Sequence, residues 1–79
     1  MKKDKTERYS VEAIKRAIET VGSASKLARD LGVTYQTVIF WKNGRVVPNP
    51  LNCLNIEKAT GGVVKREEIL PNYPWEDFK

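Results

Sequence analysis

The sequence predicts a small all-α domain of about five helices, and three observations support this fold class. Apolar residues recur every three or four positions in several short windows, which is the period of an amphipathic helix. Serine, threonine or asparagine stands where these windows begin, and glycine stands where most of them end, as expected of helix caps. The chain has 79 residues, which is enough for one domain with one small core.

Two of these windows are adjacent, between Ser23 and Gly44, and predict two helices joined by a tight turn. Ser23 can cap the first helix, and Gly32 can end it by adopting a left-handed conformation. Thr34 can cap the second helix. The inward-facing residues are expected to be Ala24, Leu27, Ala28, Leu31, Val33, Val38 and Trp41. This pattern is typical of a helix-turn-helix, whose second helix enters a DNA major groove, although an αα-hairpin that only packs would look similar.

The outer face of the Thr34–Asn43 helix would then read bases, through Tyr35, Gln36, Ile39, Phe40 and Asn43. Gln36 lies in the first turn, and its amide can bond adenine N6 and N7 together. Ile39 and Phe40 have no hydrogen-bonding groups, so they would contribute shape and contact with thymine methyls. Alternatively both are core residues. A helix cannot turn four consecutive side chains inward, so at least one of the pair is expected outside.

The positive charge is concentrated around this motif. The net charge is +4 overall, and it divides into +2 over residues 1–22, +3 over residues 23–48 and −1 over residues 49–79. Positive charge concentrated in residues 1–48 suits a polyanion that binds on one side of the domain. The N-termini of helices also attract anions. We therefore expect phosphate contacts from Ser23, Ser25, Lys26, Thr34, Lys42 and Arg45.

Residues 1–9 are predicted to be a flexible basic arm. The folded DNA-binding domain, with its C-terminal dimerisation segment, is predicted to span residues 10–79. The arm is highly charged; it is either an ordinary solvated terminus or a tail that follows phosphates through Lys2, Lys3, Lys5 and Arg8. Ser10 caps a scaffold helix that ends at Gly22, with an apolar stripe of Val11, Ile14, Ile18 and Val21.

After the motif, the prolines of RVVPNP predict an extended connection, with Val46 and Val47 against the core. Asn49 then caps a helix with Pro50 at its first position, which ends at Gly61-Gly62. Residues 63–65 are either a short extended piece or the lead into a one-turn helix at residues 66–70, which Pro71 would end. Apolar residues from residue 50 onward exceed what one small core absorbs, which predicts dimerisation through Leu51, Leu54, Tyr73, Trp75 and Phe78. The three aromatic rings of this set are expected to pack either on the domain itself or on a second copy.

Other classes of protein are disfavoured. The single cysteine, Cys53, allows no internal disulfide, and the absence of histidine removes the usual zinc ligands, so we expect neither a metal nor a cofactor. There is no plausible catalytic set, so an enzyme is not expected. No apolar run approaches the ~20 residues of a membrane helix, which predicts a cytoplasmic protein.

The stretches GVTYQTVIFWKNGRVVP and CLNIEKATGGVVKREEILP resemble the phage Cro-type and YdaS/DicC-like repressor family, over roughly Val11 to Pro71. The resemblance implies a small lambda-repressor-like domain, all-helical or with a C-terminal hairpin. It also implies a dimer that binds a palindromic operator and represses phage or prophage promoters. Relatives commonly have polar residues in place of Ile39 and Phe40. They also have a hydroxyl residue as the cap of the last helix, where this sequence has Lys65, so that helix is expected to fray.

Two functions of different classes follow from these patterns. The first is a dimeric, sequence-specific repressor that binds double-stranded DNA. The alternative is an antitoxin-like protein-interaction module, since members resembling YdaS have also been labelled antitoxins. In that case the helix-turn-helix face, with Ile39 and Phe40, would contact a protein.

Overall fold

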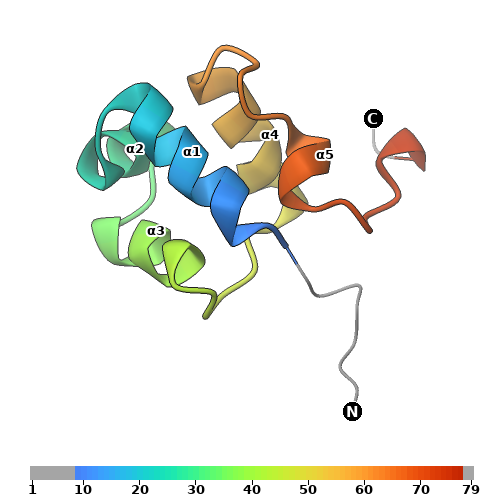
Figure 1. Ribbon diagram of the computed structural model, residues 1–79, viewed down its shortest axis with the longest axis horizontal. Coiled ribbons are helices and arrows are strands. Elements are labelled where there is room, and N and C mark those ends of the chain that lie inside the picture. The colour runs from blue at the N-terminus through green and yellow to red at the C-terminus, as the bar shows by residue number, and fades with distance from the viewer. Residues whose placement is uncertain (1–8, 78–79) are drawn as a thin grey trace.

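The computed structural model describes residues 9–77 and confirms the all-α class. Its helices are α1 (Val11–Val21), α2 (Ala24–Leu31), α3 (Tyr35–Lys42), α4 (Pro50–Ala59) and α5 (Arg66–Ile69), followed by the 3₁₀ helix η2 (Trp75–Asp77). Helix α1 contacts α2, α3 and α5, while α4 contacts α2 and α5 (Figure 1). No strand occurs between residues 9 and 77, so the segment after α4 forms turns and a one-turn helix rather than a hairpin.

Each of the four long helices begins at the predicted N-cap. The side-chain oxygens of Ser10, Ser23, Thr34 and Asn49 accept hydrogen bonds from the backbone N–H three residues later, at 2.8 to 3.1 Å. These bonds satisfy backbone donors that have no partner within the helix. Capping of this kind depends only on nearby residues, which is why the sequence predicted it.

The core forms around Trp41, the largest fully buried side chain, which is 1% exposed. Helices α1, α2 and α3 surround it with Ile14, Leu27 and Val38, and the later segments add Ile56, Val64 and Ile69. This core fixes the crossing of α2 and α3, because both helices bury their inner faces in it.

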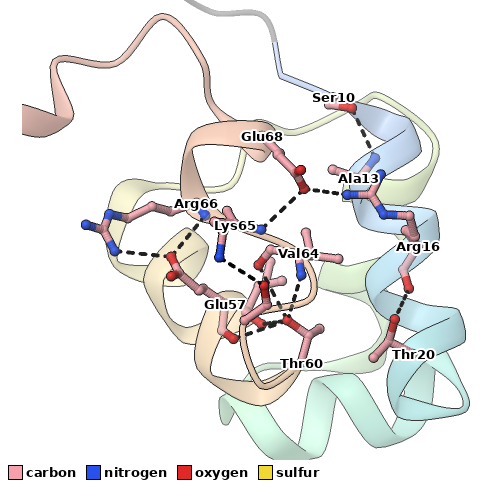
Figure 2. A network of polar contacts seen from close by, with 12 residues as sticks. Ser10, Ala13, Arg16, Thr20, Glu57, Thr60, Val64, Lys65, Arg66 and Glu68 are labelled. Carbon is pink, nitrogen blue, oxygen red and sulfur yellow. Dashed lines mark hydrogen bonds and ion pairs between the residues drawn. The ribbon is translucent and has the colours of Figure 1, made fainter.

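A polar network attaches α5 to the rest of the fold (Figure 2). The Glu57 Oε1 atom accepts from the Arg66 backbone N–H and from Arg66 Nη1, both at 3.1 Å. The buried Thr60 hydroxyl accepts from the Val64 N–H at 3.2 Å. On the other side, Glu68 pairs with Arg16 of α1.

Lys65 precedes α5 and makes no side-chain cap hydrogen bond. Its own backbone N–H donates to Glu68 Oε1 at 3.3 Å, so a carboxylate in the first turn satisfies the backbone donor of this residue. The pairing of Glu68 with Arg16 holds that carboxylate in position.

Two expectations were wrong. Val46 and Val47 are exposed, at 45% and 39%, because Pro48 rather than either valine enters the core from this connection. Tyr9, predicted as the end of a solvated arm, is half-buried and packs against the core. The remainder of the predicted arm, residues 1–8, lies outside the described residues. Among residues 9–77, no helix is long and apolar enough to cross a membrane.

Candidate nucleic-acid interface

Helices α2 and α3 form the predicted helix-turn-helix. Gly32 ends α2 with φ of 73°, and the Val33 N–H donates to the Ala28 carbonyl at 3.0 Å, which makes the turn compact. Thr34 then starts α3. With Val38 and Trp41 fully buried, the opposite side of α3 faces away from the core.

The candidate base-reading residues are together on this side of α3 but differ in exposure. Tyr35, Gln36 and Asn43 are exposed, and 53% of Tyr35 is accessible. Ile39 and Phe40 are both half-buried, so neither is a core residue and neither is fully outside. The polar candidates therefore lie at the two ends of the helix, and the half-buried Ile39 and Phe40 lie between them.

The C-terminal end of α3 is more firmly held than the sequence indicated. The Tyr9 hydroxyl donates to the Trp41 carbonyl at 2.6 Å, and burial raises the pKa of this phenol. The Arg45 guanidinium lies over the Phe40 ring, with its carbon 5.9 Å from the centroid. Sequence reasoning missed the role of Tyr9, since 32 residues separate it from Trp41.

The candidate phosphate-binding residues fall into three groups. The hydroxyl oxygens of Ser23 and Thr34 accept the cap hydrogen bonds, so toward a phosphate these residues can offer only the hydroxyl proton, beside the amides of the first turns. Ser25 and Lys26 are exposed on α2, where Lys26 Nζ lies 3.1 Å from Asp30 Oδ2. Lys42 and Arg45 are exposed beyond the base-reading turn, and within residues 9–77 neither has a carboxylate at ion-pair distance.

The candidate dimerisation residues are not equally available. Leu51 is 60% exposed, whereas Leu54 and Tyr73 are half-buried. Trp75 does not fit the expected role, because it is only 8% exposed and its Nε1 donates to the Leu70 carbonyl at 2.8 Å. The indole instead completes the core of the same chain. Phe78 lies outside the described residues.

The remaining chemistry of the chain is limited. Within residues 9–77, the structure has no group of three or more potential metal ligands from His, Cys, Asp and Glu. Cys53 is fully buried, and burial raises the pKa of its thiol to about 12. A thiol of this kind is a small apolar core residue and a poor nucleophile.

Comparisons with known proteins agree with the resemblance noted in the sequence. A family model described as "Bacterial toxin YdaS" matches residues 14–78. The chain is 42% identical over 72 residues to the "Putative transcriptional regulator YdaS" of Escherichia coli (strain K12), covering 90% of this chain and 69% of that protein. It is 31% identical over 62 residues to the "Regulatory protein cro" of Pseudomonas phage D3, covering 78% and 85%. No solved structure matches the chain significantly. Because the family model matches most of the sequence, this protein belongs to the YdaS family.

Proposed function

We propose that this protein is a sequence-specific DNA-binding transcriptional repressor of the Cro type, which inserts α3 into the major groove of its operator. The observation that carries the proposal is the outer face of α3 and the loop after it, where Gln36, Lys42 and Arg45 are exposed without an ion pair or side-chain hydrogen bond among residues 9–77. The names of the two relatives, a Cro regulatory protein and a transcriptional regulator, support it.

In this proposal the side chains divide into two roles. Gln36, in the first turn of α3, reads an adenine through its amide, because recognition helices place their N-terminal residues at base edges. Lys26 on α2, Lys42 at the end of α3 and Arg45 just after it bind phosphates, which positions the helix without selecting a sequence. Ile39 supplies apolar contact with thymine methyl groups.

The test is selection of binding sites from a random duplex library, followed by fluorescence anisotropy titration at several salt concentrations. Binding through phosphates must weaken steeply as salt rises. Lys42→Ala should lower the salt slope by about one unit and weaken all sequences alike. Lys58→Ala is the matched control, since Lys58 is also an exposed lysine but lies on α4. If no sequence is enriched and the wild type shows no salt-dependent binding, the proposal is wrong.

Thymine contact has its own test. Replacing thymine by uracil at each operator position removes only the methyl group, so the affinity should fall at the position beneath Ile39. Ile39→Ser should abolish that difference. Equal binding of thymine and uracil at every position would contradict apolar reading by α3.

We also propose that the protein binds a palindromic operator as a dimer, with half-sites about one helical turn, ~34 Å, apart. The exposed Leu51 on α4 supports an interface there, and the half-buried Leu54, one turn further along α4, and Tyr73 are further candidates. A footprint would give the spacing directly. Leu51→Lys should weaken the dimer without unfolding the monomer, whereas a footprint confined to one half-site would refute the dimer.

A protein partner for the same face is the second candidate. Tyr35 is 53% exposed next to the half-buried Ile39 and Phe40, which is more apolar surface than phosphate binding requires. The salt titration separates the two functions, because binding to a protein through apolar surface would respond weakly to salt.

A further inference from the structure

We propose that Phe40 is a positioning residue, whose ring holds the Arg45 guanidinium in place to bind a DNA phosphate. This inference rests on the proposed function and assigns Phe40 to a role other than reading bases. It follows from the way α3 ends, from the charge environment of Arg45 and from a comparison with a second arginine in the same molecule.

The backbone brings the two side chains together. Gly44 adopts φ of 78°, the Arg45 N–H donates to the Phe40 carbonyl at 2.9 Å, and the Gly44 N–H donates to the Trp41 carbonyl at 3.2 Å. These two bonds define a Schellman motif, in which the residues at the positions of Phe40 and Arg45 commonly make a hydrophobic contact. Here a guanidinium takes the place of the apolar side chain.

The contact has the geometry of a cation–π interaction. The Arg45 guanidinium carbon lies 5.9 Å from the centroid of the Phe40 ring, within the ~6 Å range of such pairs. A planar guanidinium that lies on a ring keeps its N–H edges free, and these edges are the groups that bind a phosphate in two-point fashion.

The loop that carries Arg45 is also held by contacts with Tyr9, Trp41 and α1. The Trp41 carbonyl accepts from the Tyr9 hydroxyl at 2.6 Å as well as from Gly44, and the Trp41 side chain is buried. A Cβ added to Gly44 would lie 3.7 Å from Val11 Cγ2, so this turn rests against α1. The Arg45 side chain is therefore an exposed group on a well-held backbone.

A second arginine shows what an arginine with a purely structural role looks like in this fold. Arg66 lies over the Trp75 ring at 5.6 Å, and its charge is matched by Glu57, 3.1 Å away. Arg45 has the ring but, within residues 9–77, no carboxylate. The Arg45 guanidinium is therefore available to an anion from outside the described residues. A phosphate fits, because the residues that flank a recognition helix contact the DNA backbone.

The test is a double-mutant cycle on DNA affinity with Phe40→Leu and Arg45→Ala, using the duplex selected for the wild type. Phe40→Leu keeps apolar bulk but removes the aromatic face. We expect it to weaken binding roughly two- to five-fold in the wild type and not at all in the Arg45→Ala background. Phe40→Tyr keeps the ring and should restore the affinity.

A spectroscopic measurement on the free protein separates this inference from the proposed function. The side-chain protons of Arg45 should show an upfield ring-current shift by NMR, which Phe40→Leu removes and Phe40→Tyr retains. Circular dichroism and thermal unfolding confirm that each variant is folded.

The possible results lead to different conclusions. Equal losses from Phe40→Leu in both backgrounds would show that Phe40 acts independently of Arg45, which would overturn the inference while leaving DNA binding intact. Absence of a ring-current shift would overturn it as well. If the wild type itself shows no salt-dependent DNA binding, the proposed function fails, and the phosphate role of Arg45 fails with it.

Discussion

The outer face of α3 and the junction of α4 with α5 contain similar polar side chains, but the two regions use them differently. At the junction, Glu57, Thr60 and Arg66 direct their side chains to partners within the chain. On the outer face of α3, Gln36 and Lys42 have no side-chain hydrogen bond or ion pair among residues 9–77. Polar groups at the junction thus stabilise the fold, whereas those on α3 remain available for a ligand.

The largest effect on stability should come from Thr60→Val at the junction. Valine keeps the shape of threonine but leaves the buried Val64 N–H without its acceptor, which costs about 1–3 kcal/mol. Thr20→Val is a matched control, because both threonine hydroxyls donate to the carbonyl four residues earlier, whereas Thr20 is exposed. Urea unfolding measures both variants. Equal, small effects would show that the junction is no more dependent on its polar groups than the surface is.

A pH titration of stability should give the next largest effect, through Cys53 in α4. The unfolded thiol loses its proton near pH 9.0, whereas burial raises the pKa of the folded thiol to about 12. Deprotonation therefore favours the unfolded state, so the full stability is present below pH 9 and is lost as the pH rises toward 12. The loss attributable to Cys53 should be about 1 kcal/mol at pH 10.

Urea unfolding at pH 7 and pH 10 checks this prediction, with Cys53→Ala as the control that lacks the thiol. The alanine variant should lose less stability on going to pH 10. The same decline in both proteins would mean that the thiol is not protected by the packing of α4.

The ion pair between Glu57 and Arg66 should contribute less than either effect. Glu57→Gln retains an acceptor for the Arg66 N–H but removes the charge, and the partly exposed pair is screened by solvent, so we expect a loss of at most about 1 kcal/mol. Glu67→Gln provides the comparison, since Glu67 is half exposed and its Oε2 is 3.8 Å from Arg66 Nε. If the two variants unfold at the same urea concentration, Glu57 has no special role in holding α5.

Much of the fold could be predicted because its signals are local. The caps Ser10, Ser23, Thr34 and Asn49 depend on residues within one turn, and all four were confirmed. The placement of Val46 and Val47 could not be predicted, because it depends on the path of a connection whose core contact is made by Pro48.

The candidate site was predicted less completely, for two different physical reasons. The contact between Tyr9 and Trp41 joins distant parts of the chain, and no sequence pattern indicates it. The contact between Phe40 and Arg45, in contrast, follows from a local signal that sequence reasoning did not use. A glycine after an asparagine at the end of a helix indicates a Schellman motif, which brings these two positions together.

The smallest effect on stability and the clearest contrast with the junction should come from Gln36→Ala. Gln36 is exposed in the first turn of α3, where it makes no side-chain hydrogen bond within residues 9–77, and alanine favours a helix at least as well. The free energy of unfolding should therefore change by less than about 0.5 kcal/mol.

The affinity for the selected duplex should nevertheless fall roughly ten-fold, since a glutamine bound to adenine by two hydrogen bonds discriminates strongly. Base substitutions in the duplex give the decisive measurement: Gln36→Ala should relax preference at one position, whereas Lys42→Ala should weaken every sequence alike. A stability loss as large as that of Thr60→Val would instead place Gln36 among the structural residues, and the contrast between the two regions would not hold.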